Sequence, residues 1–185
     1  MSDTLTTTIP LGFKAPDFSL SDTVSGQIRS LSELKSDKAT VIMFICNHCP
    51  FVLHVKDELV KMANEYIPKG ISFIAISSND VEKYPQDGPD IMKEFAQKNK
   101  FPFPYLYDEI QDVAHAYSAA CTPDFSIFDA EMKCVYRGQL DDSRPANGIH
   151  VTGKDLRDAL DNIIAGKPVS TNQKPSIGCN IKWKK

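Results

Sequence analysis

Two continuous apolar runs of strand length dominate the hydrophobic pattern of this chain. Residues 39–45 and 71–78 are rich in β-branched side chains and lack polar alternation, which predicts strands that are buried on both faces. Between these runs, apolar residues from Val52 to Tyr66 recur at helical spacing, and Gly70 closes the pattern. A strand, a helix and a strand in this order predict a parallel crossover unit.

Shorter segments with helical or strand patterns flank this unit. Phe18 and Leu20 alternate with polar neighbours and predict a hairpin with residues 27–29 through a turn at Gly26. The remaining predicted elements are a single-turn helix after a capping box of Ser30 and Glu33, a helix capped by Asp90, an extended segment 101–107, a short helix 113–120, a hairpin of 125–128 and 134–138, and a helix 155–164 capped by Thr152. Residues 79–89, which contain Pro85, Gly88 and Pro89, are expected to form a long polar loop. Loops of that length are often functional, although a surface excursion is the simpler expectation.

The order of these elements predicts an α/β fold with a central mixed sheet flanked by helices. A length of 185 residues suits one domain with a proper core. We expect residues 1–185 to form a single domain, with an N-terminal hairpin extension at 10–38, a core at 39–165 and a C-terminal tail at 166–185 that packs back onto it.

Two cysteines stand three residues apart where the first buried strand gives way to the helix. They are Cys46 and Cys49, in the segment CNHCP. Because Pro50 suits a first helical turn, both thiols are expected at a helix N-terminus, where free N–H groups and the helix dipole favour a thiolate. Cys46 is expected to be the more acidic thiol, with His48 adding positive charge beside it. Such a pair predicts thiol–disulfide exchange, in which one thiol attacks and the other resolves.

Charge and composition narrow the possible partners and the compartment. The formal net charge is −3 and the lysines are scattered, so we expect neither a nucleic acid nor an anionic membrane as partner. The first residues lack the basic and apolar regions of a secretory signal, and no apolar run is long enough to cross a bilayer. Five cysteines without an export signal favour a reducing compartment, so we expect a cytoplasmic location.

Several motifs together resemble a known family. A CxxC pair at the start of the crossover helix, a Thr-Pro opening a hairpin and a final helix resemble the thioredoxin fold. The segment APDF at 15–18 is similar to the start of the extension in peroxiredoxins and membrane-tethered thioredoxin-like proteins. The wider motifs that resemble a peroxiredoxin-like thioredoxin family, related to AhpC/TSA, are CNHCPFV at 46–52, TPD at 122–124, RGQ at 137–139, DDSRP at 141–145 and SIGCNIKW at 176–183.

This resemblance implies roles for individual residues. Cys46 is the attacking thiol, Cys49 is the resolving thiol, and Pro123 is a cis proline that faces them. The backbone of Thr122 is then free to pair with an extended substrate segment. The residues expected to shape the site are Asn47, His48, Pro50, Thr122 and Pro123.

The expected activity is that of a thiol–disulfide oxidoreductase, with antioxidant activity and a part in cell redox homeostasis. The cysteine pair itself does the redox work, without a separate cofactor or metal. The expected partners are disulfides and thiols of proteins or small molecules. An external donor, such as a thioredoxin or glutathione system, recycles the pair.

The chain departs from both parent families near the cysteines. Thioredoxins carry a Trp before the first cysteine and a buried carboxylate on the preceding strand, whereas here Ile45 stands before Cys46 and residues 39–47 contain no Asp or Glu. His48 or water is therefore left to carry protons. Peroxiredoxins carry Thr or Ser three residues before the reactive cysteine, where this chain has Met43.

Two alternative functions stay open. One is peroxide reduction at Cys46, which the peroxiredoxin-like extension supports and Met43 weakens. The other is a metal-binding or redox-sensing module, in which Cys46 and Cys49, with Cys121 or His48, bind Zn(II) or Cu(I), because thiolates select such soft ions.

Three further residues are accessory candidates. Cys121 directly precedes the Thr-Pro turn, although burial as a small apolar residue is the simpler expectation. Arg144 could supply positive charge for peroxide chemistry, but for Arg144 and Arg137 we expect surface ion pairs with neighbouring Asp residues. For Cys179 two interpretations stay open: a mobile tail that brings a further thiol to the site, or a docked tail with a buried cysteine.

Overall fold

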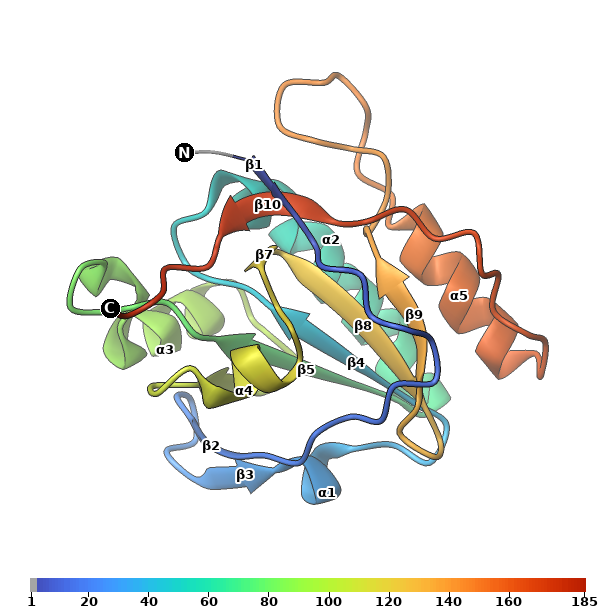
Figure 1. Ribbon diagram of the computed structural model, residues 1–185, viewed down its shortest axis with the longest axis horizontal. Helices are drawn as coiled ribbons and strands as arrows, with labels where there is room; N and C mark the ends of the chain where they lie inside the picture. The colour runs from blue at the N-terminus through green and yellow to red at the C-terminus, as the bar shows by residue number, and fades with distance from the viewer. Residues whose placement is uncertain (1–2) are drawn as a thin grey trace.

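A seven-stranded mixed sheet forms the centre of the structure, a computed structural model that describes residues 3–185. The strand order is β3-β2-β6-β5-β4-β8-β9 (Figure 1). In its middle, β4 (Ala39–Phe44) pairs in parallel with β5 (Ile71–Ser77) and antiparallel with β8 (Asp124–Asp129). Every residue of β4 is buried, which confirms the prediction from its continuous apolar run.

Helices and loops cover both faces of the sheet. Alternate side chains of β4 point to opposite faces: Val41 and Met43 join one apolar cluster, and Ile42 and Phe44 join the other. The first cluster contains residues of α2 (Pro50–Tyr66), α3 (Pro89–Lys98) and α5 (Lys154–Ile164). The second contains residues of α1 (Leu31–Leu34) and α4 (Asp112–Ala116). The mixed α/β fold predicted from the sequence is confirmed.

The front hairpin extends the sheet. Strands β2 (Ser19–Asp22) and β3 (Ile28–Ser30) pair with each other, and β2 also pairs with β6 (Tyr105–Tyr107). The Ser30 side chain accepts a hydrogen bond from the Glu33 N–H at 3.2 Å and caps α1. The predicted hairpin and the Ser30 cap are therefore both confirmed.

Two predicted helix caps are wrong. Gly88, not Asp90, caps α3, because the helix already begins at Pro89 and a proline suits a first helical position. Gly153, not Thr152, caps α5. Gly153 adopts φ of 69°, in the left-handed region that glycine occupies without steric cost.

A second, smaller sheet joins the two ends of the chain. Strand β10 (Ile177–Asn180) lies between β1 (Asp3–Leu5) and β7 (Cys121–Thr122), and both pairings are antiparallel. Figure 1 shows β10 crossing above the start of α2, against which it packs. The predicted docking of the tail is confirmed, and within residues 166–185 the docked part includes a strand that the sequence did not indicate.

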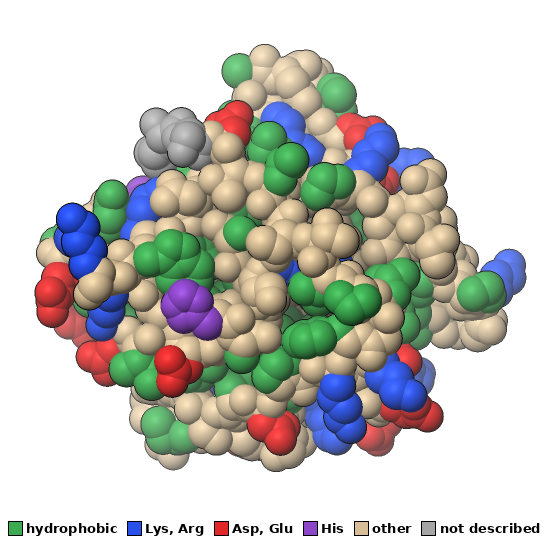
Figure 2. Space-filling model, in the orientation of Figure 1, with side chains coloured by type: hydrophobic (Ala, Val, Ile, Leu, Met, Phe, Trp, Pro, Cys, Tyr) green, Lys and Arg blue, Asp and Glu red, His purple; other side chains and the backbone are tan. Residues whose placement is uncertain are grey.

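The outer surface mixes both signs of charge. On the face seen in Figure 2, acidic and basic side chains lie next to one another around the rim, and uncharged groups cover the middle. In the described residues, no helix combines the length and the apolarity needed to cross a membrane.

The remaining elements are β9 (Cys134–Gly138), which is the second strand of the hairpin with β8, and the 3₁₀ turns Ile67–Lys69 and Pro85–Asp87.

Candidate functional site

Cys46 and Cys49 lie where β4 leads into α2, but they occupy different local environments. Cys49 is the N-cap of α2 and Pro50 is its first residue, whereas Cys46 lies in the connecting segment before the cap. The expectation that both thiols sit on the first helical turn therefore holds only for Cys49. Both are buried, with exposures of 1% for Cys46 and 0% for Cys49.

Thr122 connects the two thiols. Its hydroxyl lies 3.6 Å from the Cys46 sulfur, and its carbonyl accepts a hydrogen bond from the Cys49 thiol at 3.3 Å. The Thr122–Pro123 peptide bond is cis. The structure thus confirms both the cis proline and its position opposite the cysteine pair.

The backbone of Thr122 is not free, in contrast to the expectation for substrate pairing. Residue Cys179 of β10 is its antiparallel partner. The chain's own C-terminal strand therefore occupies the edge at which an extended substrate segment was expected. A strand edge that is already paired has no free backbone N–H or C=O groups to offer to a further strand.

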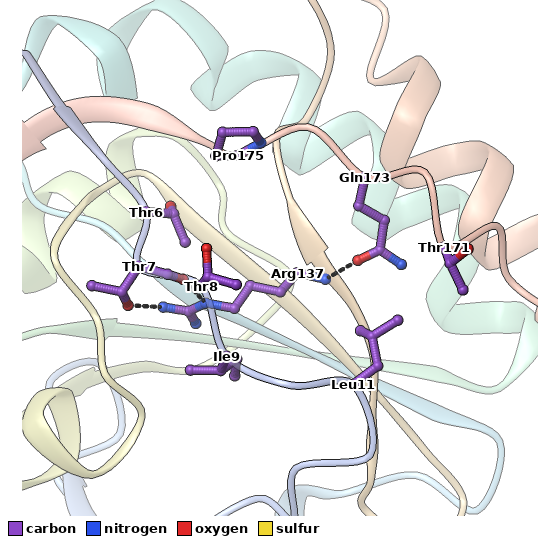
Figure 3. Close-up of a pocket in the computed structure, with 9 residues that line it drawn as sticks. All are labelled: Thr6, Thr7, Thr8, Ile9, Leu11, Arg137, Thr171, Gln173 and Pro175. Atoms are coloured by element: carbon purple, nitrogen blue, oxygen red, sulfur yellow. Dashed lines mark hydrogen bonds between the residues drawn. The ribbon is translucent and has the colours of Figure 1, made fainter.

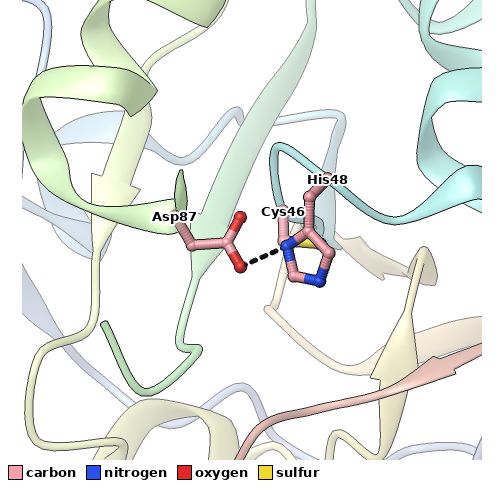
Figure 4. Close-up of side chains that lie close together, drawn as sticks. All are labelled: Cys46, His48 and Asp87. Atoms are coloured by element: carbon pink, nitrogen blue, oxygen red, sulfur yellow. Dashed lines mark ion pairs between the residues drawn. The ribbon is translucent and has the colours of Figure 1, made fainter. Parts of the chain in front are cut away.

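A carboxylate that sequence reasoning missed completes the site. Asp87, at the end of the 3₁₀ turn Pro85–Asp87, is fully buried. Its Oδ2 lies 2.6 Å from His48 Nδ1, the ion pair that the dashed line in Figure 4 marks. The expectation that residues 79–89 are only a surface loop is therefore wrong at Asp87.

The Asp87 carboxylate is held by neutral donors as well. The Asn47 N–H donates to Oδ1 and the Asn79 amide donates to Oδ2, each at 2.9 Å. The Asn47 side chain in turn donates to the Gln86 carbonyl at 2.9 Å and accepts from the Tyr105 hydroxyl at 2.8 Å. These bonds fix the loop against the segment between the two cysteines.

The two thiols have opposite shifts of pKa. Hydrogen bonding with Cys49, burial and the charge of Asp87 raise the pKa of Cys46 well above its ordinary value. Hydrogen bonding from Cys46, and next from Cys179 and Thr122, lowers the pKa of Cys49 to about 5. These directions run against the prediction that Cys46 is the more acidic thiol, because the hydrogen bond between the two thiols favours the charged form of Cys49, and burial and the Asp87 charge disfavour the charged form of Cys46.

Three residues of the site carry atoms suited to metal coordination. One ligand atom each from Cys46, His48 and Asp87 lie within 4.8 Å of one another. Sulfur, nitrogen and oxygen ligands of this kind are all accepted by Zn²⁺. The structure thus brings together a set in which Asp87 replaces the Cys49 and Cys121 considered from the sequence.

Cys121 does not share this environment. It is fully buried in β7, and its sulfur lies 3.4 Å from the Thr6 hydroxyl and 3.7 Å from the Pro123 carbonyl. Burial raises the pKa of Cys121 to about 12. These contacts support the simpler expectation of a buried small side chain.

Arg137 and Arg144 are both engaged away from the thiols. Arg137 is buried and pairs with Asp124 at 3.3 Å, so the expectation of a surface ion pair is wrong for this residue. Figure 3 shows its guanidinium bonded to Thr7 beside a surface pocket of about 220 Å³. Arg144 donates to the carbonyls of Asp141 and Ser143 and to the Gln139 side chain. These hydrogen bonds hold its guanidinium group within its own loop.

One sequence signal pointed to the missed carboxylate. Residues 79–89 form a long connection between two elements, and loops longer than usual are often functional. The local pattern did not indicate which of the five acidic side chains in and next to it, Asp80, Glu82, Asp87, Asp90 or Glu94, reaches His48.

Comparison with known proteins identifies relatives along the whole chain. A model of the AhpC/TSA family matches residues 11–137. The crystal structure of an uncharacterized conserved protein from Geobacillus kaustophilus is 61% identical, covers 100% of this chain and 97% of its own, and superposes with a TM-score of 0.98. A search of curated proteins finds no match.

More distant structures share the fold. Peroxidoxin BcpB from Mycobacterium tuberculosis is 19% identical over 86% of this chain and 98% of its own, with a TM-score of 0.63. The thioredoxin domain of a thiol-disulfide oxidoreductase from Bacteroides vulgatus is 22% identical over 70% of this chain and 89% of its own, with a TM-score of 0.58. Both likenesses show a thioredoxin-like fold.

Proposed function

The chain belongs to the AhpC/TSA family, and from this premise we propose that it is a thiol–disulfide oxidoreductase whose reacting groups are Cys46 and Cys49. The observation that carries the proposal is the position of Thr122, before the cis Pro123, against both thiols: its hydroxyl lies 3.6 Å from the Cys46 sulfur and its carbonyl 3.3 Å from the Cys49 sulfur. The hydrogen bond between the two thiols shifts the pKa of Cys49 downward and that of Cys46 upward. The thioredoxin-like fold and its redox neighbours support the same reaction class.

In the first step, Cys46 attacks a substrate disulfide. The proton that Cys46 shares with Cys49 passes to His48, while the Cys46 sulfur bonds to one substrate sulfur and the other leaves as a thiolate. Asp87, 2.6 Å from His48 Nδ1, stabilises the imidazolium that forms. A nucleophile activated by a base, which a third group orients, is a common catalytic arrangement. It supplies the proton carrier that the strand before Cys46 lacks.

In the second step, Cys49 resolves the mixed disulfide. Its thiolate attacks the Cys46 sulfur, the substrate's second thiol leaves, and a Cys46–Cys49 disulfide remains. The low pKa of Cys49 supports both directions of this step. At neutral pH the thiolate is ready to attack, and in the reverse reaction a low-pKa thiol is a good leaving group.

Recycling requires an outside partner. We propose that an external dithiol or glutathione reduces the Cys46–Cys49 disulfide, and that the substrates are disulfides of proteins or small molecules.

A redox titration tests the proposal. The chain is equilibrated with glutathione buffers of graded potential, and the fraction of each cysteine in a disulfide is read by alkylation and mass spectrometry. We expect one cooperative two-electron transition that Cys46→Ser and Cys49→Ser both abolish. Cys134→Ser is the matched control, because Cys134 is equally buried at 1% exposure in β9. A transition that survives in either active-site variant would contradict the proposal.

Peroxide reduction is a second candidate because the structure supplies the hydroxyl that Met43 does not. The Thr122 hydroxyl lies 3.6 Å from Cys46, although it comes from a different element than in peroxiredoxins. Arg144, the arginine considered for this chemistry, donates instead to the Asp141 carbonyl in its own loop. Stopped-flow reaction of the reduced chain with hydrogen peroxide decides: fast, Thr122-dependent oxidation of Cys46 favours the peroxidase, and slow oxidation excludes it.

Metal binding is a third candidate, on the ligand set of Cys46, His48 and Asp87. Competition with a chromophoric zinc chelator measures the affinity of the reduced chain. Tight binding that is lost in His48→Ala, together with thiols that react only after chelator is added, favours this function. Thiols that react equally fast with and without zinc exclude it.

A further inference from the structure

A third thiol lies at the edge of the site, on the strand that occupies the expected substrate position. Cys179 is buried in β10, with 3% of its surface exposed. Its register partner is Thr122, the residue whose hydroxyl faces Cys46 and whose carbonyl faces Cys49. The three cysteines therefore converge on one residue.

The backbone of β10 approaches Thr122 very closely. A Cβ on Gly178 would lie 1.9 Å from the Thr122 carbonyl oxygen and 3.2 Å from the Pro123 nitrogen. Any other residue at position 178 would push the strand away. Ser176, directly before β10, holds the same register, because its buried hydroxyl donates a hydrogen bond to the Pro123 carbonyl at 2.6 Å.

Cys46, Cys49 and Cys179 also belong to one buried cluster. Paired residues of antiparallel strands place their side chains on the same face, and the Thr122 side chain faces Cys46, so Cys179 lies on the face of β10 that is turned to the cysteine pair. Burial, and next the Cys49 thiol, raise the pKa of Cys179 to about 12. Because sulfur must approach sulfur for exchange, Cys49 can form a disulfide with either neighbour.

We propose that Cys179 is a third redox-active thiol, which β10 presents to Cys49 in the position of a substrate strand and which exchanges with the Cys46–Cys49 disulfide. This inference rests on the proposed function, because the disulfide that Cys179 attacks is the product of the proposed reaction. It assigns β10 the role of an internal substrate.

The exchange balances without an outside reagent. The Cys179 sulfur bonds to Cys49, the Cys46–Cys49 bond breaks, and the proton lost by Cys179 ends on the released Cys46. One disulfide is broken and one is formed, so the chain stays oxidised by two electrons. Cys46 becomes a thiol again, and can meet a second substrate before the chain is reduced.

Disulfide mapping of the full-length Cys46→Ser variant tests the proposal. The reduced variant is treated with one equivalent of diamide, quenched in acid, alkylated in denaturant, digested and analysed by mass spectrometry. We expect a Cys49–Cys179 disulfide in most of the protein. The same disulfide should appear as a minor species in oxidised wild-type protein, beside Cys46–Cys49.

Two double variants are the controls, and circular dichroism checks that each variant is folded. Cys46→Ser with Cys179→Ser should leave Cys49 without an intramolecular disulfide, whereas Cys46→Ser with Cys134→Ser should keep the Cys49–Cys179 bond. Cys49 that becomes blocked by added glutathione while Cys179 stays fully alkylated would overturn the proposal. The wild-type sample reports the proposed function separately, because that function fails only if Cys46–Cys49 does not form.

Discussion

At the scale of single residues, a side chain from a distant part of the chain supplies a group that the segment around Cys46 lacks. The strand before Cys46 carries no acidic side chain, and Asp87 brings a buried carboxylate to the same place from a distant loop. After the Cys49 hydrogen bond and burial, its charge is a further cause that raises the pKa of Cys46, and its Oδ2 lies 2.6 Å from His48 Nδ1. The proposed reaction therefore makes the reactivity of Cys46 depend on a proton acceptor more than on a standing thiolate.

Replacing Asp87 by Asn should separate these two effects. Without the carboxylate, the pKa of Cys46 falls, because the negative charge that raises it is gone. The rate of disulfide exchange falls by a factor of about 10² to 10⁴, the usual contribution of an acid–base group. Both are measured from the pH dependence of the reaction with a chromogenic disulfide.

Asp90→Asn is the matched control, because Asp90 is exposed in the first turn of α3. It should leave the rate and the pH profile unchanged. An Asp87→Asn variant with a normal rate and an unshifted profile would show that Asp87 serves only to fold the loop.

The lowered pKa of Cys49 makes a prediction about pH. A thiol with a pKa of about 5 is a thiolate above that pH and becomes protonated as the pH falls through it. The ultraviolet absorbance of the thiolate should therefore decrease between about pH 6 and pH 4 in the reduced chain. Cys49→Ser should lose this step and Cys134→Ser should keep it. A step that persists without Cys49 would assign the charge to another thiol.

At the scale of elements, the pairing of β10 limits the access of a protein substrate to the cysteines. It fills the edge of β7 opposite Thr122 and pairs with β1 on its other side. A protein substrate that pairs with Thr122 must therefore displace β10, whereas exchange with Cys179 requires no displacement. The close packing of Gly178 on Thr122 is the contact that maintains this arrangement.

Gly178→Ala should loosen β10. The added methyl group would lie 1.9 Å from a backbone oxygen, and overpacking of this kind costs roughly 1–3 kcal/mol. We expect a lower urea midpoint, together with faster reaction of the site thiols with a bulky reagent. In the control Gly148→Ala, where the methyl group meets nothing within 4 Å at φ of 74°, thiol reactivity should not change. Equal reactivity in both variants would refute a covering role for β10.

At the scale of the whole molecule, β1 and β10, which come from opposite ends of the described chain, pair beside the candidate site. The segment that starts with β1 holds β10 through further bonds, including that from the Thr6 N–H to the Ser176 carbonyl at 2.8 Å. All three thiols of the site are at most 3% exposed. Access to the site is therefore coupled to the pairing of distant parts of the chain.

Thr6→Pro should expose the thiols by weakening this pairing. Proline lacks the N–H that bonds Ser176, and losing a hydrogen bond of about 1 kcal/mol should speed thiol modification in the folded chain roughly fivefold. Thr6→Ala is the control, because it removes the hydroxyl beside Cys121 but keeps the N–H. If Thr6→Ala accelerates modification as much as Thr6→Pro does, backbone pairing is not the cause.

The order of elements could be predicted from the sequence because secondary structure depends on neighbouring residues. The buried strands, the helix after CNHCP, the front hairpin and its Ser30 cap all follow from side-chain spacing within short segments. The caps at Gly88 and Gly153 were missed because glycine has no side chain to signal a cap. Strand β10 was missed because its four residues, Ile177 to Asn180, show no clear alternation.

The sequence by itself therefore determined the fold class, the junction that carries Cys46 and Cys49, and the Thr-Pro turn opposite them. Only the tertiary structure decided which thiol is acidic, which carboxylate faces His48 and which strand covers the site. The reason is physical. Asp87 accepts a hydrogen bond from Asn47, which is 40 positions away in the chain, and Cys179 on β10 pairs with Thr122 on the neighbouring strand β7. Charge, burial and thiol contacts depend on distance in space, which local spacing does not encode.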